Sequence, residues 1–124
     1  MMFTEHSDPA LRKDILHRAS QMPVERLREQ LRLMMMWDAG RFATVMSQIK
    51  VPLCVVQSTT VNADRKRHSL AAGDSTGYLK TMTRLAPHAT QQVIPDCGHF
   101  TQLEAVEDTN SAIAAIAQQV FGRK

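Results

Sequence analysis

The sequence is poor in the residues that mark several common protein classes. Its 124 residues include two cysteines, one tryptophan, one tyrosine and four phenylalanines. Cys54 and Cys97 provide neither a disulfide framework nor the paired spacing of a metal site. Aromatic rings for stacking on bases are few, and a net charge of +3 is no nucleic-acid signature. We therefore expect no metal, no organic cofactor and no nucleic acid.

Long hydrophobic runs are also absent. No apolar stretch approaches the roughly 20 residues that a membrane-spanning helix requires. The first residues lack the charged and then apolar layout of a signal peptide. Hydrophobic residues still make up 44% of the chain, which is typical of a folded domain rather than a disordered one. The sequence predicts a small cytoplasmic protein with no membrane partner.

Helical patterns occupy most of the first 49 residues. Residues 1–7 show no such pattern and look frayed. Asp8 followed by Pro9 predicts a helix start, with a side-chain cap and a proline at the first helical position. Pro23 begins a second amphipathic helix that ends near Asp38, and a shorter helical pattern covers 39–49.

The second half of the sequence predicts a strand, a helix and a second strand. Val51 to Val56 is a continuous apolar run with β-branched residues, which is typical of a buried strand. Residues 59–67 are polar and predict a loop, and 75–86 predicts a helix with Ser75 as its N-cap. Residues 91–95 form the second strand, which should run parallel to the first because a helix connects them.

A final helix is predicted over 104–121, with Gly122 at the position after its end. Its apolar stripe should be buried against the sheet. The residues of that stripe are Val106, Ile113, Ile116, Ala117 and Val120.

A histidine follows the second predicted strand. The run Val93–Phe100 ends in a tight polar turn in which His99 comes directly after Gly98. Gly98 suits a backbone position that is tightly packed or has a positive φ. Neutral imidazole is the usual general base near pH 7, so His99 is a candidate for proton transfer. An ordinary solvated loop histidine is the alternative interpretation.

Together, three stretches resemble the C-terminal part of the α/β-hydrolase fold. They are 51–58, 93–100 and the Gln102-Leu103-Glu104 segment, and the resemblance covers about residues 45–121. In that family the penultimate strand reads like VPxLVIxG, and the last strand leads to a GHF turn that carries the catalytic histidine. The resemblance implies that His99 is the general base and that Glu104 is structural.

The expected fold class is therefore α/β, as a partial α/β-hydrolase fold. A helical cap-like segment would cover 1–49, and a βαβα part of the core would cover 50–124. Many members of the family carry a helical cap over the substrate. The resemblance thus implies that Met35, Trp37 and Phe100 face a small, largely apolar substrate with an ester, amide or similar bond. A buried helix is the alternative for the methionine-rich stretch.

The remaining catalytic groups are harder to assign. Ser58 replaces the glycine that ends the family's penultimate strand, and Val61 stands where the acid is expected. Asp64 is the nearest carboxylate and could orient His99, or it could be a solvated loop residue. The pattern Gly73-Asp74-Ser75-Thr76-Gly77 matches G-x-S-x-G, but no buried strand precedes it, so we expect the nucleophile to be missing from this chain.

Two parallel strands would leave both edges of a sheet open. We therefore expect a C-terminal fragment, completed by an N-terminal hydrolase portion or by a second copy. One alternative is a non-catalytic remnant or helical protein-interaction module. Another is a basic helix that binds an acidic partner through Arg26, Arg28 and Arg32, although Glu25 and Glu29 favour local ion pairs instead.

Overall fold

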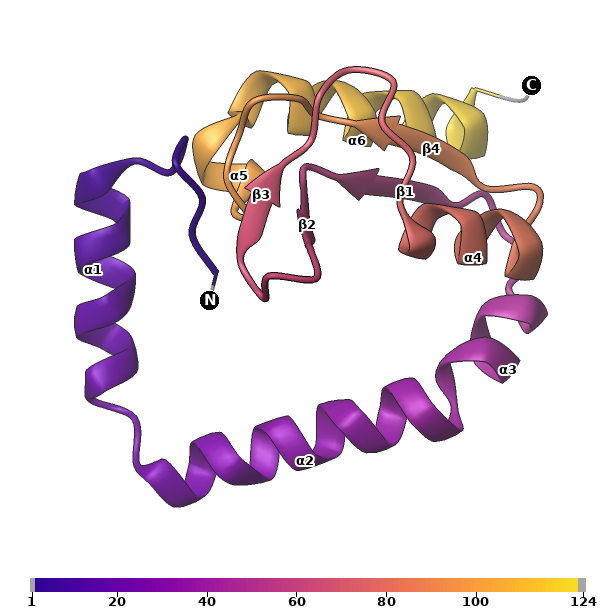
Figure 1. Ribbon diagram of the computed structural model, residues 1–124. Helices are drawn as coiled ribbons and strands as arrows, with labels where there is room; N and C mark the ends of the chain where they lie inside the picture. The colour runs from indigo at the N-terminus through magenta and orange to yellow at the C-terminus, as the bar shows by residue number, and fades with distance from the viewer. Residues whose placement is uncertain (1, 123–124) are drawn as a thin grey trace.

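The computed structural model describes residues 2–122 and has a mixed α/β architecture (Figure 1). Met1 and residues 123–124, at the ends of the predicted segments 1–49 and 50–124, lie outside the described residues. The helices are α1 (Pro9–Ser20), α2 (Val24–Gly40), α3 (Phe42–Gln48), α4 (Gly77–Leu85), α5 (Thr101–Glu104) and α6 (Val106–Phe121). The strands are β1 (Cys54–Gln57), β2 (Thr59–Val61), β3 (Arg67–Ser69) and β4 (Thr90–Val93).

The predicted parallel strand pair is confirmed. β1 pairs with β4 from Cys54 opposite Thr90 to Gln57 opposite Val93, and α4 lies between them in the chain. β1 begins three residues later than the apolar run, after Pro52, which has no N–H to donate to a ladder.

A second, antiparallel pair forms where the sequence predicted a loop. β2 and β3 pair from Thr59 opposite Ser69 to Val61 opposite Arg67, and Asn62 N donates to Lys66 O across the turn (3.1 Å). The loop prediction for 59–67 is therefore wrong for 59–61 and for Arg67, whereas 62–66 form the turn between the two strands. The β-branched residues at the start of this segment favour a strand although the segment is polar.

The core lies between β1 and α4. Val55, Leu79, Met82 and Ala86 are buried together, and Phe42 and Met46 of α3 pack against them. α6 contacts β1 from the opposite face, so the parallel pair has helices on both sides (Figure 1). The predicted apolar face of α4 is confirmed for Leu79 and Met82.

Thr76, not Ser75, caps α4. Its hydroxyl accepts from Leu79 N (3.1 Å) and donates to the Gln57 side-chain oxygen (2.7 Å). The predicted N-cap at Ser75 is therefore wrong. Because the Thr76 hydroxyl also contacts Gln57, this cap connects the start of α4 to β1 while it accepts a hydrogen bond from a backbone N–H of the helix.

The predicted final helix is confirmed as α6, which ends at Phe121 as expected and begins at Val106, two residues later than predicted. Glu104 belongs instead to the short α5, and Ala105, whose φ of −141° is not helical, separates the two helices. Gly122 ends α6 with a φ of −81°, and the left-handed conformation typical of a glycine after a helix is not used.

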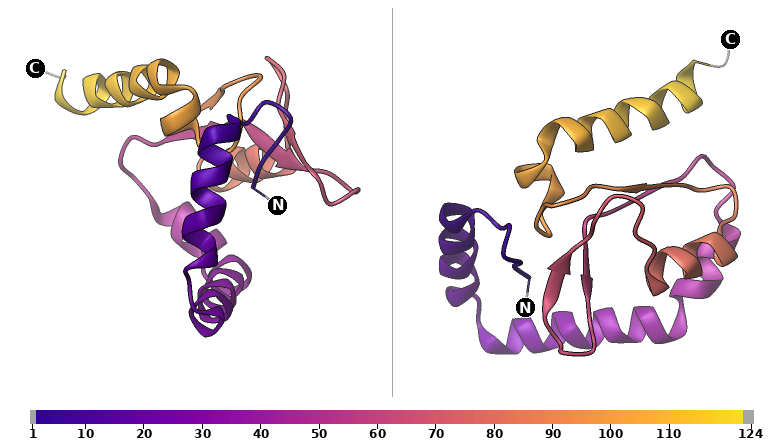
Figure 2. Two further views of the ribbon diagram at one scale, coloured as in Figure 1. Left: turned by 90° about the vertical axis from the view of Figure 1, so that its left-hand side faces the viewer. Right: turned by 45° about the horizontal axis from the view of Figure 1, so that its top comes forward.

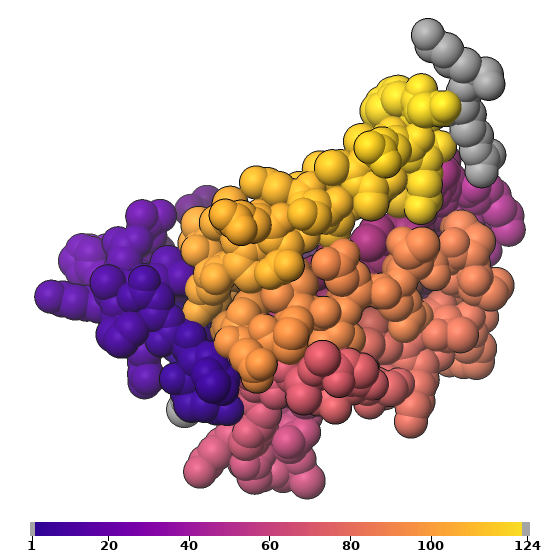
Figure 3. Space-filling view, turned by 90° about the horizontal axis from the view of Figure 1, so that it is seen from above, coloured from indigo at the N-terminus to yellow at the C-terminus, as the bar shows by residue number. Residues whose placement is uncertain are grey.

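Much of the apolar stripe of α6 is exposed. The helix runs along the surface of the molecule (Figure 3). Val106, Ile113 and Val120 are exposed, and the buried residue of the helix is Ala112. Ile116 and Ala117 are half-buried. The expected burial of the whole stripe is wrong because two strands make too narrow a sheet to cover it.

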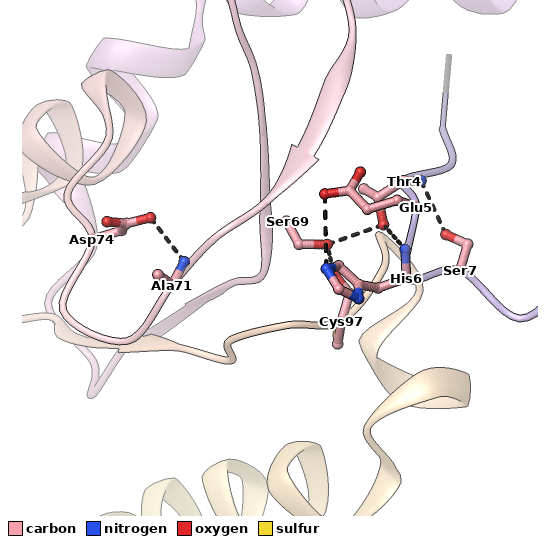
Figure 4. Close-up of polar contacts among 8 residues, drawn as sticks. All are labelled: Thr4, Glu5, His6, Ser7, Ser69, Ala71, Asp74 and Cys97. Atoms are coloured by element: carbon pink, nitrogen blue, oxygen red, sulfur yellow. Dashed lines mark hydrogen bonds and ion pairs between the residues drawn. The ribbon is translucent and has the colours of Figure 1, made fainter.

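The N-terminal segment is ordered against the rest of the molecule. Phe3 and Thr4 are buried, and the Phe3 and Phe100 ring centroids lie 6.1 Å apart. Ser69 Oγ lies 3.0 Å from Thr4 Oγ1 and donates to Cys97 O (2.8 Å; Figure 4). The expectation of fraying is therefore wrong for residues 3 and 4.

The prediction that helices precede the first strand is confirmed by α1, α2 and α3. Asp8 caps α1 as predicted, accepting from Ala10 N (2.7 Å). Every residue of α2 is exposed, and Figure 2 shows α1 and α2 extending away from the strands. Whether 1–49 is a separate cap stays a prediction. Neither α2 nor any other helix within residues 2–122 combines the length and apolar character needed to cross a membrane.

Candidate functional site

His99 lies in the turn that follows β4. The turn is anchored at its start, where Ile94 is almost fully buried and its N–H donates to Gln57 O (3.0 Å) at the end of β1. Asp96, with a φ of 52°, donates its N–H to Leu70 O (3.0 Å). The turn is thus fixed both to β1 and to the segment after β3.

At Gly98 a side chain is disfavoured by close packing rather than by φ. A Cβ at this position would collide with both carboxylate oxygens of Glu104 and with Ser7 Oγ. The positive φ of the turn falls instead on Asp96. Ser58 Oγ donates to Gly98 O (2.7 Å), so Ser58 holds the histidine turn against the end of β1.

Arg67 lies beside Nδ1 of His99, the ring nitrogen that an acid would contact in order to orient the imidazole. Arg67 Nη1 lies 3.3 Å from His99 Nδ1 and donates to Thr59 Oγ1 (2.8 Å). Thr59 Oγ1 is itself 3.5 Å from Nδ1. Because a guanidinium can only donate, Nδ1 is the acceptor of this contact. The hydrogen-bond pattern therefore assigns the proton of the neutral imidazole to Nε2.

The surroundings keep His99 neutral. Partial burial lowers the pKa of His99 from its ordinary value of 6.5, and the Arg67 charge lowers it further, while Glu104 acts in the opposite direction. Burial also lowers the pKa of Arg67. At pH 7 the site consequently holds a cationic arginine beside an uncharged imidazole.

His99 and Arg67 share a cavity of about 240 Å³. The other residues that line it are Val56, Gln57, Ser58, Thr59, Tyr78 and Thr101. They come from the end of β1, the β2–β3 hairpin and the starts of α4 and α5. The cavity thus lies where the carboxyl ends of β1 and β4 meet.

Asp64 is placed in the turn of the hairpin, with a different partner from the one predicted. Its carboxylate lies 3.1 Å from His68 Nε2 and accepts from Lys66 N (2.9 Å). The Lys66 N–H contact is the main cause of its lowered pKa. The structure does not bring Asp64 to Nδ1 of His99, where Arg67 and Thr59 lie. Its role as the orienting acid stays a prediction.

Of the three predicted substrate contacts, the structure brings Phe100 to His99. Their ring centroids lie 5.3 Å apart. Met35 is 68% exposed on α2. Trp37 lines a different hollow, formed with Leu33, Met36, Gly40 and Arg41. All three residues as substrate contacts stay predictions, since Phe100 lies beside His99 as its neighbour in the chain and is not among the described residues that line the cavity.

Ser75 does not have the setting of an elbow nucleophile. It is exposed in the turn between β3 and α4, and it lines a separate cavity of about 400 Å³ with His68 and Asp74. An elbow serine sits on a sharp turn directly after a buried strand. The three-residue β3 is only half-buried and ends six residues before Ser75.

Arg67 and Thr59 are the site residues that sequence reasoning missed. Both belong to the β2–β3 hairpin, in the segment for which the sequence predicts a polar loop. Within residues 2–122, no three His, Cys, Asp or Glu side chains gather as metal ligands would.

Comparisons with protein-family models, with curated proteins and with solved structures give no match for this chain. Within residues 2–122 the fold is mixed α/β, with one small parallel pair and one antiparallel pair of strands. The resemblance to α/β-hydrolases therefore depends on the sequence motifs.

Proposed function

We propose that this chain is the histidine-bearing part of an α/β-hydrolase-type enzyme that cleaves an ester, amide or similar bond in a small, largely apolar molecule. The observation that carries the proposal is the parallel pairing of β1 with β4. This pairing brings His99, which follows one strand, to the same sheet edge as Ser58 and Thr59, which follow the other. Open α/β sheets hold their sites at that edge.

His99 would transfer the proton between the nucleophile and the leaving group. Its lowered pKa supports this role, because a general base must be uncharged before it accepts a proton. To accept at Nε2, however, the ring must carry its own proton at Nδ1. Arg67 must therefore give way at Nδ1 to a group that can accept a hydrogen bond, such as a carboxylate.

A second portion of the enzyme would supply that acceptor, the nucleophile and the oxyanion donors. The two-stranded sheet β1–β4 supports this, since parallel strands are normally flanked by further strands. The exposure of α2 supports it too. Leu33, Met34 and Met36 are each more than half exposed, and neighbouring large apolar side chains on a protein surface often mark an interaction site.

The same exposure favours a second candidate, a non-catalytic helical module that binds another protein through α2. In that case His99 would have no catalytic partner. The two candidates differ in whether the assembled complex contains a serine activated by His99.

A fluorophosphonate probe distinguishes them. We expect no labelling of Ser75 in the chain alone. In the complex isolated through a tag on this chain, a serine of the co-purified portion should be labelled. Its labelling rate should fall about 100-fold or more with His99→Gln, because the proton transfer is lost. Ser75→Ala is the matched control and should leave the rate unchanged.

Two results would contradict the proposal. If Ser75 itself is labelled and the labelling disappears in Ser75→Ala, the nucleophile belongs to this chain. If the complex contains no labelled serine, or one that is labelled equally fast with His99→Gln, the interaction module is the better account.

A further inference from the structure

We propose that the cavity beside His99 binds a small monocarboxylate with an apolar tail. The carboxylate would be held by Arg67, by the Nε2–H of His99 and by the hydroxyls of Thr101 and Tyr78. This proposal does not depend on hydrolysis, and it needs no second portion of an enzyme.

The polar lining of the cavity is rich in hydrogen-bond donors. A guanidinium is a donor only, and with Nδ1 facing Arg67 the remaining ring proton of His99 is at Nε2. Thr101 and Tyr78, whose side chains each carry a hydroxyl, also line the cavity. No Asp or Glu is among the residues that line the cavity. A ligand that accepts several hydrogen bonds and carries negative charge matches this set.

A carboxylate fits better than a cation. Among the described residues that line the cavity, Arg67 is the charged one, and its positive charge attracts an anion and repels a cation. A planar carboxylate also matches the fork of a guanidinium, and such charge-assisted contacts are the strong ones. The partial burial of Arg67 strengthens the attraction, because less water screens it.

The rest of the cavity selects for a compact apolar body. Val56 and the ring of Tyr78 supply apolar wall. At about 240 Å³, the cavity lies below the ~300–1,000 Å³ of sites for drug-sized ligands. A single aromatic ring or a short alkyl chain is therefore a suitable tail, and benzoate is a convenient probe.

The test is a titration of the ¹⁵N-labelled chain with sodium benzoate, followed by NMR. Before addition, the ring nitrogens of His99 should report a proton on Nε2 and none on Nδ1. We expect saturable shifts of the His99 ring and of residues that line the cavity. Benzamide, the neutral analogue, should produce much weaker shifts at the same concentrations.

Variants locate the site. Arg67→Gln should weaken benzoate binding by roughly tenfold or more, because a charge-assisted contact is lost. Arg65→Gln is the matched control in the turn of the same hairpin and should bind as the unaltered chain does. Thr101→Val removes one donor and keeps the arginine, so a weakening of a few-fold is expected even if Arg67→Gln perturbs folding.

The proposal is overturned if tens of millimolar benzoate produce no saturable shift around His99. Equal affinity in the unaltered chain and in Thr101→Val, or equal binding of benzamide, would overturn it as well. A proton found on Nδ1 before addition would overturn the proposal too, because Nε2 would then have no proton to donate to the carboxylate. None of these results bears on whether a second portion supplies a nucleophile.

Discussion

Replacing Met82 with alanine is expected to lower the free energy of unfolding by about 2–5 kcal/mol. Met82 is 1% exposed on α4, where it packs with Val55, Leu79 and Ala86. Alanine would lose most of this apolar contact and leave a cavity that the surrounding helices and strand can only partly fill. Small domains are stable by about 5–15 kcal/mol, so the loss would be a large fraction of the total.

Met35→Ala is the matched control, because it makes the same chemical change on another helix. Met35 is 68% exposed, so its replacement should change the free energy of unfolding by less than about 0.5 kcal/mol. Urea denaturation followed by circular dichroism measures both variants. Equal midpoints for the two would mean that the cluster between β1 and α4 is not the core of the fold.

Replacing Gly98 with alanine is expected to lower the free energy of unfolding by about 1–3 kcal/mol. The new methyl group would occupy the space of the Glu104 carboxylate and Ser7 Oγ. Glu104 is held there, since its Oε2 accepts from Phe100 N (2.9 Å). Moving the carboxylate breaks that charge-assisted contact in the residue next to His99. The resonances of the His99 ring should therefore shift as well.

Gly77→Ala is the control for this substitution. A Cβ at Gly77 meets nothing within 4 Å, and the residue is the first of α4, so alanine should be neutral or slightly stabilising there. If the collision is the cause, Gly98→Ala should cost less in a Glu104→Ala background, as a double-mutant cycle would show. Equal melting temperatures for the two glycine variants would contradict this account of the turn.

The elements that were predicted correctly are determined by residues within them or next to them in the chain. Asp8 caps α1 because the aspartate and the following proline determine a helix start by themselves. β1 and β4 are parallel because two neighbouring strands that are joined by a helix have few other arrangements. The packing of Met82 follows from the apolar spacing of its own helix.

The features that could not be predicted depend on the register of distant segments. Arg67 reaches His99, 32 residues later in the chain, because the hairpin places β3 beside the turn after β4. Asp64 is drawn to His68 by the same hairpin geometry. The exposure of Ile113 on α6 depends on how many strands the sheet has, and the pattern of the helix itself contains no such information.

The most direct test of the central claim is to sequence the transcript that carries this coding region and to translate both flanks and the neighbouring reading frames. The account predicts a segment with buried strands and a G-x-S-x-G turn that leads from a strand into a helix, either joined to this chain or encoded beside it. That result would provide the nucleophile for His99. A transcript whose frames contain no such segment would contradict the hydrolase proposal and leave the α2 interaction module as the better interpretation.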